Sequence, residues 1–267
     1  MITCITYGDK KYQSAGRLNL ETAKMHGADK TILYGPHDLP LSFKLQNWRV
    51  YYARSGKHLY WRGAGFWIWK SYIIKKTLQQ LNEGDILIYS DAASVYVNDI
   101  GELLKTFYEE NLNMMVFTLL HLEKEYTKRD AFVLLDADSS EYTDTRQRIG
   151  TYIVMQKNDE TIKIVDEWHK ACRDYRIITD SKNRMGKDNY PDYITHRHDQ
   201  SILSIVAKKN GIMEYRDPSQ YGNDSSQWPD DIITRSTYPQ IWYSTRNPKI
   251  DTLQKFNDMV LDPSKVE

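Results

Sequence analysis

Residues 61–97 read W-R-G-A-G-F-W-I-W-K-S-Y-I-I-K-K-T-L-Q-Q-L-N-E-G-D-I-L-I-Y-S-D-A-A-S-V-Y-V, and this stretch decides the fold. Ile74, Leu78 and Leu81 are spaced i, i+4 and i+7, which predicts a helix with one apolar face. Gly84 predicts the end of that helix, because glycine adopts the left-handed cap conformation without steric cost.

A short buried strand is expected after the helix. Residues 86–89, Ile-Leu-Ile-Tyr, are rich in strand formers, too few for a helix and bounded by turn residues. Asp91 stands where this strand should stop. In open α/β sheets, ligands bind beyond the carboxyl ends of the strands. The position therefore predicts Asp91 as a ligand of a metal or a substrate, although a turn or a helix N-cap would also account for it.

The order of the predicted elements indicates an α/β fold with a mostly parallel, Rossmann-like central sheet flanked by helices. The chain opens with a strand at 2–7, a helix at 15–26 and a strand at 30–34, and such β-α-β units form parallel sheets with right-handed crossovers. The later pattern predicts helices at 99–110, 158–175, 198–209 and 251–261, strands at 114–119 and 149–155, and a further strand-like apolar run at 132–135.

The domain organisation is predicted from length and from the lack of an evident linker. The 267 residues contain no internal repeat and no low-complexity tract, so we expect one domain over 1–267. Within it, residues 1–98 and residues 99–267 are expected to form two halves. No G-x-G-x-x-G follows the first strand, so the dinucleotide-binding fingerprint is absent.

Composition excludes several classes of protein. Lys plus Arg and Asp plus Glu are 36 each, so the basic excess typical of nucleic-acid binders is missing. No window has the roughly 20 apolar residues that a membrane span needs. The two cysteines, Cys4 and Cys172, fall in apolar runs and are expected as buried thiols rather than a disulfide. We therefore expect a cytoplasmic protein without a transmembrane segment, for which peripheral membrane association stays open.

A second acidic motif competes with Asp91. Asp136 and Asp138 form a literal D-x-D after the apolar run at 132–135. Such a short motif occurs often by chance, so its order along the chain is more informative than its spelling. Asp91 follows two β-α units, where a parallel sheet presents its ligand edge, whereas Asp138 leads into a polar loop. The sequence favours Asp91.

Several spaced motifs together resemble the GT-A-fold glycosyltransferases of bacterial and large-virus glycan synthesis, and more distantly the glycogenin-like retaining transferases. The motifs are R-G-A-G-F-W-I-W-K-S-Y-I-I (62–74), G-D-I-L-I-Y-S-D-A-A (84–93), T-K-R-D-A-F (127–132), H-R-H-D-Q-S-I-L-S-I (196–205) and Y-G-D-K-K-Y (7–12). The likeness covers most of residues 1–215, and it implies that residues 1–98 form the half that binds a nucleotide sugar and residues 99–267 the half on the acceptor side. It implies a nucleotide-sugar donor, most simply a UDP-sugar, a divalent cation (Mn²⁺ or Mg²⁺) and transfer of one sugar to a hydroxyl of a glycan acceptor.

The resemblance assigns the site residues position by position. Asp91 is similar to the first acid of the GT-A D-x-D and would hold the metal, but Ala93 stands at the third position. One carboxylate with diphosphate and water would then hold the cation, or the cation would be bound weakly. The residues expected to bind the donor are Tyr7, Asp9, Arg17, Trp67, Lys70, Asp91 and Gln200.

Asp199 is the expected catalytic residue. It precedes Gln200 in a segment similar to the D-Q motifs of the glycogenin-like enzymes, where the acid lies beside the transferred sugar. It would bind sugar hydroxyls, act as a base toward the acceptor or stabilise charge at the anomeric carbon; a plain helix N-cap is the simpler reading. His196 and His198 flank Asp199, and a structural role is expected for both. No histidine follows His198, so the C-terminal metal-binding histidine of those families is missing.

Further basic residues and one long polar loop complete the expectations. Arg235, Arg246 and Lys249 are candidates for neutralising a diphosphate, because a guanidinium group matches phosphate geometry. The loop at 176–197 is expected to order over bound donor and exclude water. A catalytically inactive nucleotide- or carbohydrate-binding relative is the alternative function. A nucleotidyltransferase is disfavoured, because no Gly-rich basic loop follows the first strand.

Overall fold

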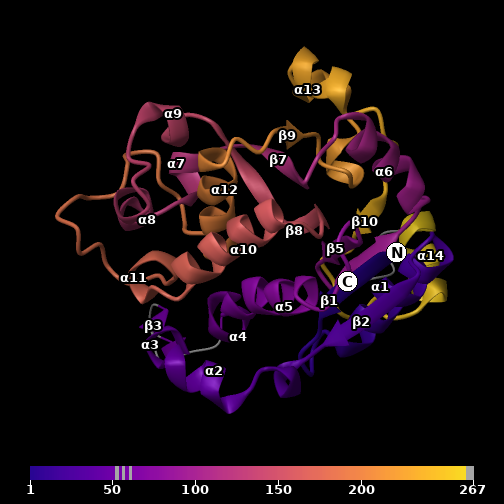
Figure 1. Ribbon diagram of the computed structural model, residues 1–267, viewed down its shortest axis with the longest axis horizontal. Helices are drawn as coiled ribbons and strands as arrows, with labels where there is room; N and C mark the ends of the chain where they lie inside the picture. Colours follow the sequence, from indigo (N-terminus) through magenta and orange to yellow (C-terminus); the bar gives the residue numbers. More distant parts are fainter. Residues whose placement is uncertain (52–53, 56–57, 60–61, 263–267) are drawn as a thin grey trace.

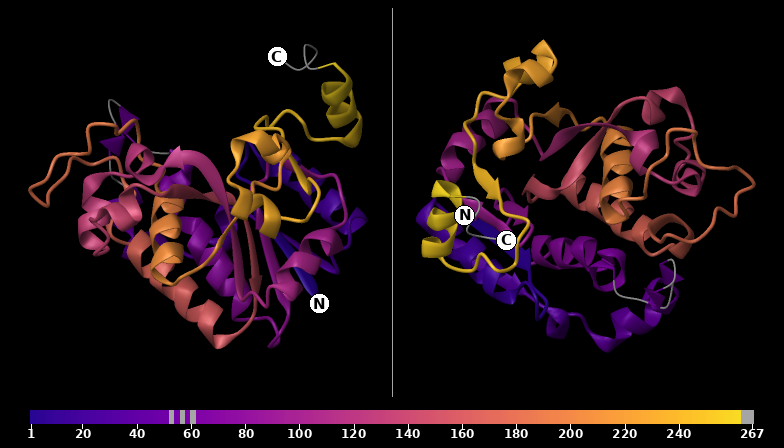
Figure 2. Two further views of the ribbon diagram at one scale, coloured as in Figure 1. Left: turned by 90° about the horizontal axis from the view of Figure 1, so that it is seen from above. Right: turned by 180° about the vertical axis from the view of Figure 1, so that it is seen from behind.

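The computed structural model describes residues 1–51, 54–55, 58–59 and 62–262. Trp61, with which the deciding stretch begins, lies outside them. A central sheet runs through the molecule with helices on both of its faces, which gives three layers (Figures 1 and 2). The sequence-based expectation of an α/β fold with a flanked, mostly parallel sheet is confirmed.

The central sheet has six strands in the order β2-β1-β5-β8-β7-β9. β2, β1 and β5 are parallel, β8 is antiparallel to both of its neighbours, and β7 and β9 are parallel. Only β8 therefore runs against the others. The bounds are β1 Ile2–Tyr7, β2 Lys30–Tyr34, β5 Ile86–Ser90, β7 Met114–Leu122, β8 Arg146–Gln156 and β9 Glu214–Tyr215, and two small sheets pair β6 Ser94–Tyr96 with β10 Trp242–Ser244 and β3 Arg54–Ser55 with β4 His58–Leu59.

The alternation of side chains in β5 explains why both faces of the sheet are covered. Ile86 and Ile88 pack on one face in a cluster with α1 (Gln13–Met25) and α6 (Ile100–Glu109). Leu87 and Tyr89 pack on the other face in a cluster with α5 (Ile68–Leu78), α10 (Asp159–Cys172) and α12 (Asp199–Lys209). A strand buried on both faces reads as a continuous apolar run, and each such side chain contributes about 1.5–3 kcal/mol.

The helix starts follow local capping chemistry. Asp99 accepts a hydrogen bond from Gly101 N (2.6 Å) before α6, and Asn158 accepts one from Thr161 N (2.8 Å) before α10.

The remaining helices are α2 Leu41–Gln46, α3 Trp48–Tyr51, α4 Gly63–Phe66, α7 Glu123–Tyr126, α8 Arg129–Leu134, α9 Ser140–Thr143, α11 Tyr175–Ile178, α13 Asp230–Arg235 and α14 Leu253–Leu261, with 3₁₀ turns η1 Pro36–Asp38, η2 Gln220–Gly222 and η3 Ser225–Gln227.

Three details of the sequence-based prediction are wrong. The strand-like run at 132–135 lies in and just after α8, because a short apolar run also fits one buried face of a helix. The helix expected to reach Gly84 begins after Trp67, whose φ of 58° is left-handed, but it ends already at Leu78 (α5). The helix at 158–175 ends at Cys172, and a separate short helix, α11, follows.

Cys4 and Cys172 are both buried and unpaired, as expected. Among the helices of the described residues, none combines the length and the apolar character that crossing a bilayer requires.

Candidate functional site

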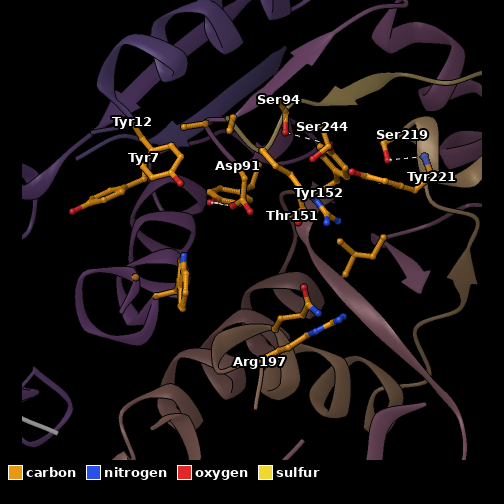
Figure 3. A pocket seen from close by; sticks show the side chains of 18 of the residues that line it. Tyr7, Tyr12, Asp91, Ser94, Thr151, Tyr152, Arg197, Ser219, Tyr221 and Ser244 are labelled. Carbon is orange, nitrogen blue, oxygen red and sulfur yellow. Dashed lines mark hydrogen bonds between the residues drawn. The ribbon is translucent and has the colours of Figure 1, made fainter. Parts of the chain in front are cut away.

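A pocket of about 770 Å³ lies where the carboxyl ends of β1, β5 and β7 meet (Figure 3). The chain goes from β1 to β2 on one side and returns to β5 on the other, so the order of the strands reverses between β1 and β5. Ligands of open α/β sheets bind at such a switch point, because the loops leaving the two strands diverge there. Tyr7 at the end of β1 and Asp91 just after β5 both line the pocket.

Aromatic rings form one wall of the pocket. The Tyr7 ring stacks on Trp69, with ring centroids 3.8 Å apart and planes inclined by 17°. Trp69 is held in turn by its indole N–H, which donates to Gly63 O at 2.8 Å. Asp9 follows Tyr7 and closes a turn, since its Oδ1 accepts from Lys11 N (2.9 Å) and Tyr12 N (3.1 Å).

The segment between Gly63 and Trp67 adopts a left-handed backbone. Ala64, Phe66 and Trp67 have φ of 52°, 53° and 58°, a conformation that side chains other than glycine rarely adopt. A Cβ atom at Gly63 would lie 2.2 Å from the Trp67 ring, so only glycine fits there. Gly63, Ala64 and Trp67 line the pocket, and strain of this kind clusters at functional sites.

Asp91 is the pocket carboxylate nearest the end of β5. Its Oδ1 accepts from the Tyr89 hydroxyl at 2.6 Å and forms an ion pair with Lys70 Nζ at 3.2 Å. The Asp91 side chain is 38% exposed, so it still faces the pocket. Burial, followed by the Asp91 charge, raises the pKa of Tyr89 well above its usual value, so the phenol stays protonated and donates.

Asp199 lies on the other side of Lys70. Its Oδ2 is 3.1 Å from Lys70 Nζ, and the side chain is only 4% exposed. Burial raises the pKa of Asp199 to about 6, against the lowering effect of Lys70. For Lys70, burial acts to lower the pKa, but the charges of Asp199 and Asp91 outweigh it and the pKa is raised. A protonated Lys70 therefore joins the two carboxylates at neutral pH.

The C-terminal part of the chain forms the facing wall. The carbonyl of Ala93 accepts from Thr245 N at 2.9 Å and from the Thr245 hydroxyl at 3.0 Å, which brings Arg246 to the pocket. The Arg246 guanidinium lies 4.5 Å from the ring centroid of Tyr221, a second lining residue. Ala93 stands where a D-x-D motif would have its second acid, and its backbone carbonyl joins two distant segments of the chain.

Residues before and at the start of α12 line the side of the pocket opposite β1 (Figure 3). The Arg197 guanidinium lies 3.7 Å from the ring centroid of Tyr126, so its direction is fixed. Gln200 Oε1 accepts from Gly150 N (3.0 Å), and its Nε2 donates to Gln147 Oε1 (2.9 Å). Both ends of the Gln200 amide are therefore held by the protein.

The structure brings most of the predicted site residues together. Tyr7, Asp9, Trp67, Asp91 and Gln200 line the pocket. Lys70 and Asp199 lie behind the lining, connected to it through Asp91. Arg17 is exposed on α1 and is not a lining residue.

The other candidate residues divide in the same way. Arg246 lines the pocket, and Arg235 and Lys249 do not. His196 and His198 are buried and donate to the carbonyls of Ile177 and Ile178, each at 2.8 Å, as expected for structural histidines.

The competing motif at Asp136 and Asp138 lies away from the pocket, and its second acid holds the long polar loop. Asp138 contacts Arg129 Nε at 2.7 Å, Lys187 Nζ at 2.6 Å and the Tyr190 hydroxyl at 2.8 Å. Neither carboxylate lines the pocket.

The loop at 176–197 is not arranged as a cover. Asp130 accepts from the backbone N–H groups of Arg184 (2.7 Å) and Met185 (3.0 Å), and Lys128 Nζ donates to Ser181 O (2.5 Å). The loop projects at the side of the molecule beside α8 and α11 (Figure 1), and Arg197 alone of its residues lines the pocket.

Sequence reasoning missed much of the pocket lining. Lys11 and Tyr12 directly follow the first strand, so their position was a usable signal. No sequence signal placed the residues that come from other strands and from the C-terminal segment, which are Leu119, His121, Ile149, Thr151, Tyr152, Asp217, Ser219, Tyr221 and Ser244.

The residues at this edge do not form a cage for a divalent cation. Asp91 Oδ1 is engaged by Tyr89 and Lys70, and Ala93 offers no carboxylate. Within the part of the chain that the structure describes, no three His, Cys, Asp or Glu side chains are grouped as metal ligands. A cation bound through Asp91 stays a prediction.

Comparisons with known proteins give distant likenesses in structure. No protein-family model and no curated protein matches the chain. The structure is similar to the apo crystal structure of mouse xyloside xylosyltransferase 1, with 9% identity and a TM-score of 0.48 over 91% of this chain and 97% of that one. It is also similar to the apo structure of WbbM, a bifunctional glycosyltransferase, with 12% identity and a TM-score of 0.49 over 91% of this chain and 45% of that one. At these values the likenesses carry no argument about activity; both structures have glycosyltransferase names.

Proposed function

We propose that this protein is a glycosyltransferase that binds a nucleotide diphosphate sugar in the pocket and transfers the sugar to a hydroxyl group of a glycan. The observation that carries the proposal is the position of the pocket. It lies at the switch point of the sheet and gathers Tyr7, Asp9, Trp67, Asp91 and Gln200, which the motifs had marked as donor-binding residues.

The aromatic wall suits the nucleoside. The stacked Tyr7 and Trp69 rings present apolar surface against which a base can lie. Asp9 Oδ1 is used within its own turn, which leaves Oδ2 to accept from a ribose hydroxyl. Uridine is the base we expect, in keeping with the resemblance.

The basic residues of the pocket suit the diphosphate. Lys11, Arg197 and Arg246 line it from three separate segments of the chain. When the bond between sugar and diphosphate breaks, negative charge develops on the leaving group, and cations already in place lower the barrier. Each guanidinium lies over an aromatic ring, Tyr126 or Tyr221, so neither has to be ordered at the moment of reaction.

The geometry changes the role expected for Asp199. A carboxylate that is 4% exposed and absent from the pocket lining does not touch the sugar in this arrangement. It holds Lys70, and Lys70 holds Asp91, the carboxylate that faces the ligand. We therefore assign Asp199 to positioning, with Asp91 and Gln200 beside the transferred sugar.

A binding protein without turnover is the second candidate. It is favoured by the burial of Asp199 and by the Gln200 amide, both ends of which are bonded to the protein. Neither side chain is then free to act on an acceptor. In this alternative the pocket binds the same ligand, but no sugar is transferred.

A donor-panel assay tests the proposal. The protein is incubated with UDP-, GDP-, ADP- and dTDP-sugars, each with Mn²⁺ and with EDTA, and nucleoside diphosphate release is measured over time. We expect slow release from one donor without acceptor, because water replaces the acceptor hydroxyl. Thermal stabilisation by a nucleotide with no release from any donor would favour the binding protein. Pyrophosphate formation from a nucleoside triphosphate and a sugar phosphate would identify a nucleotidyltransferase instead.

A further inference from the structure

Lys70 makes an unusual set of contacts for a lysine. Its Nζ lies 3.2 Å from Asp91 Oδ1, 3.1 Å from Asp199 Oδ2 and 2.9 Å from the carbonyl oxygen of Gly150. The ring centroid of Tyr89 is 5.0 Å away, and the Lys70 side chain is 4% exposed. The ammonium donates a hydrogen bond to the Gly150 carbonyl and forms ion pairs with the two carboxylates.

Burying the charge of Lys70 lowers the stability of the fold unless other interactions offset it. Removing a lysine from water is costly, and the cost is recovered only where opposite charges and hydrogen bonds surround it. The first turn of α5 carries Lys70 between the end of β5 and the start of α12, and each of these elements supplies one carboxylate. Without Lys70, Asp91 and Asp199 would face each other with no cation between them.

The three oxygens are of the kind that a divalent metal selects. Mg²⁺, Mn²⁺ and Ca²⁺ take carboxylate and carbonyl oxygens, at about 2.0–2.6 Å for Mg²⁺ and Ca²⁺. The distances from Nζ to the three oxygens, 2.9–3.2 Å, are longer than metal–oxygen bonds and are those of an ammonium with one hydrogen bond, to Gly150, and two ion pairs. A metal could use this set of oxygens only after Lys70 had left.

We propose that Lys70 is the resident cation of this pocket: its ammonium supplies, between Asp91 and Asp199, the fixed positive charge that a bound divalent metal would otherwise provide. The inference rests on the proposed function for its role in turnover. Two consequences follow. The natural protein needs no divalent cation to bind or use its donor, and removal of the Lys70 side chain creates a metal site from Asp91, Asp199 and the Gly150 carbonyl.

The first experiment measures Mn²⁺ binding without any nucleotide, by titration calorimetry on EDTA-treated protein. We expect no saturable binding to the natural protein. Lys70→Ala should bind Mn²⁺ saturably with a stoichiometry of one, and Mn²⁺ should raise its melting temperature. Lys75→Ala is the matched control, because Lys75 lies on the same helix, is paired with Asp166 at 2.8 Å and is outside the pocket lining; it should gain no Mn²⁺ binding.

The second experiment measures donor turnover by the natural protein with EDTA and with Mn²⁺. We expect rates within about twofold of each other, whereas a loss of about tenfold or more in EDTA that Mn²⁺ restores would overturn the inference. One-to-one Mn²⁺ binding to the natural protein, or a folded Lys70→Ala protein that gains none, would also overturn it.

The two proposals fail in distinguishable ways. If no donor is turned over under any condition, the proposed function fails, and the Mn²⁺ titrations still decide the role of Lys70. If Lys70→Ala does not fold even with Mn²⁺, the titration of the natural protein decides: absence of saturable binding supports a resident ammonium, and its presence contradicts it.

Discussion

Two acidic segments of this chain look alike in sequence and do different work in the fold. Asp91 lies at the carboxyl end of β5, faces the pocket and is joined through Lys70 to Asp199. Asp138 follows α8, contacts Arg129, Lys187 and Tyr190, and holds a polar loop against the body of the protein. The comparison teaches that a short carboxylate motif acquires its role from the element that precedes it: a parallel strand delivers the acid to a ligand site, and a helix end does not.

The largest expected difference is in turnover. Asp91→Asn keeps the shape of the side chain and removes its charge, so we expect donor turnover to fall by about 10³-fold, as for loss of a group that stabilises developing charge. Asp138→Asn should change turnover by less than about threefold. Nucleoside diphosphate release by the two purified variants checks this. An inactive but folded Asp138→Asn protein would contradict the assignment of Asp138 to a purely structural role.

Acid should lower the free energy of unfolding, because two histidines near the junction of the polar loop and the pocket are buried in their neutral form. His196 lies near the end of the loop and His198 just after it, and burial lowers the pKa of His198 from 6.5 to about 4 and that of His196 well below 6.5. The fold therefore favours the neutral rings. The neutral rings contribute fully to the free energy of unfolding above about pH 6.5. This contribution is lost as the pH falls toward 4, by about 3 kcal/mol for His198.

Urea unfolding at about pH 7 and about pH 4.5 measures this change. His196→Gln should show a shallower decline than the natural protein, since one titrating group is gone. A free energy of unfolding that does not change between the two pH values would contradict the burial of neutral imidazoles.

Asp199 should affect turnover more than it affects nucleotide binding. Because it acts through Lys70, Asp199→Asn should lower turnover by about 30-fold while the affinity for nucleotide changes by less than about threefold. Rates of donor use and nucleotide titration by calorimetry separate the two quantities. Equal losses in both would place Asp199 in direct contact with the donor.

The smallest expected effect concerns stability. Asp138→Asn removes the charge that pairs with Arg129 and Lys187, so we expect a loss of about 1–2 kcal/mol in the free energy of unfolding and faster proteolysis within residues 182–190. Asp91 is more exposed, and Asp91→Asn should cost less stability. The reverse order would mean that Asp91, and not Asp138, is the structural acid.

Sequence patterns were sufficient where the signal is local. The run Ile86–Tyr89 predicted a strand because it is rich in strand formers and bounded by turn residues, and the helices expected at 99–110 and 158–175 begin where Asp99 and Asn158 cap the first turn. The apolar run at 132–135 was misread, since four apolar residues satisfy a strand and a buried helix face equally well.

By itself, then, the sequence determined the α/β class, the position of Asp91 at a strand end and the burial of both cysteines, because these follow from neighbours along the chain. Only the tertiary structure decided that Lys70 lies between Asp91 and Asp199, that Arg246 reaches the pocket beside Ala93, and that the polar loop is held aside. Those contacts join segments tens to more than a hundred residues apart, and their energies depend on burial and distance, which no spacing along the chain encodes.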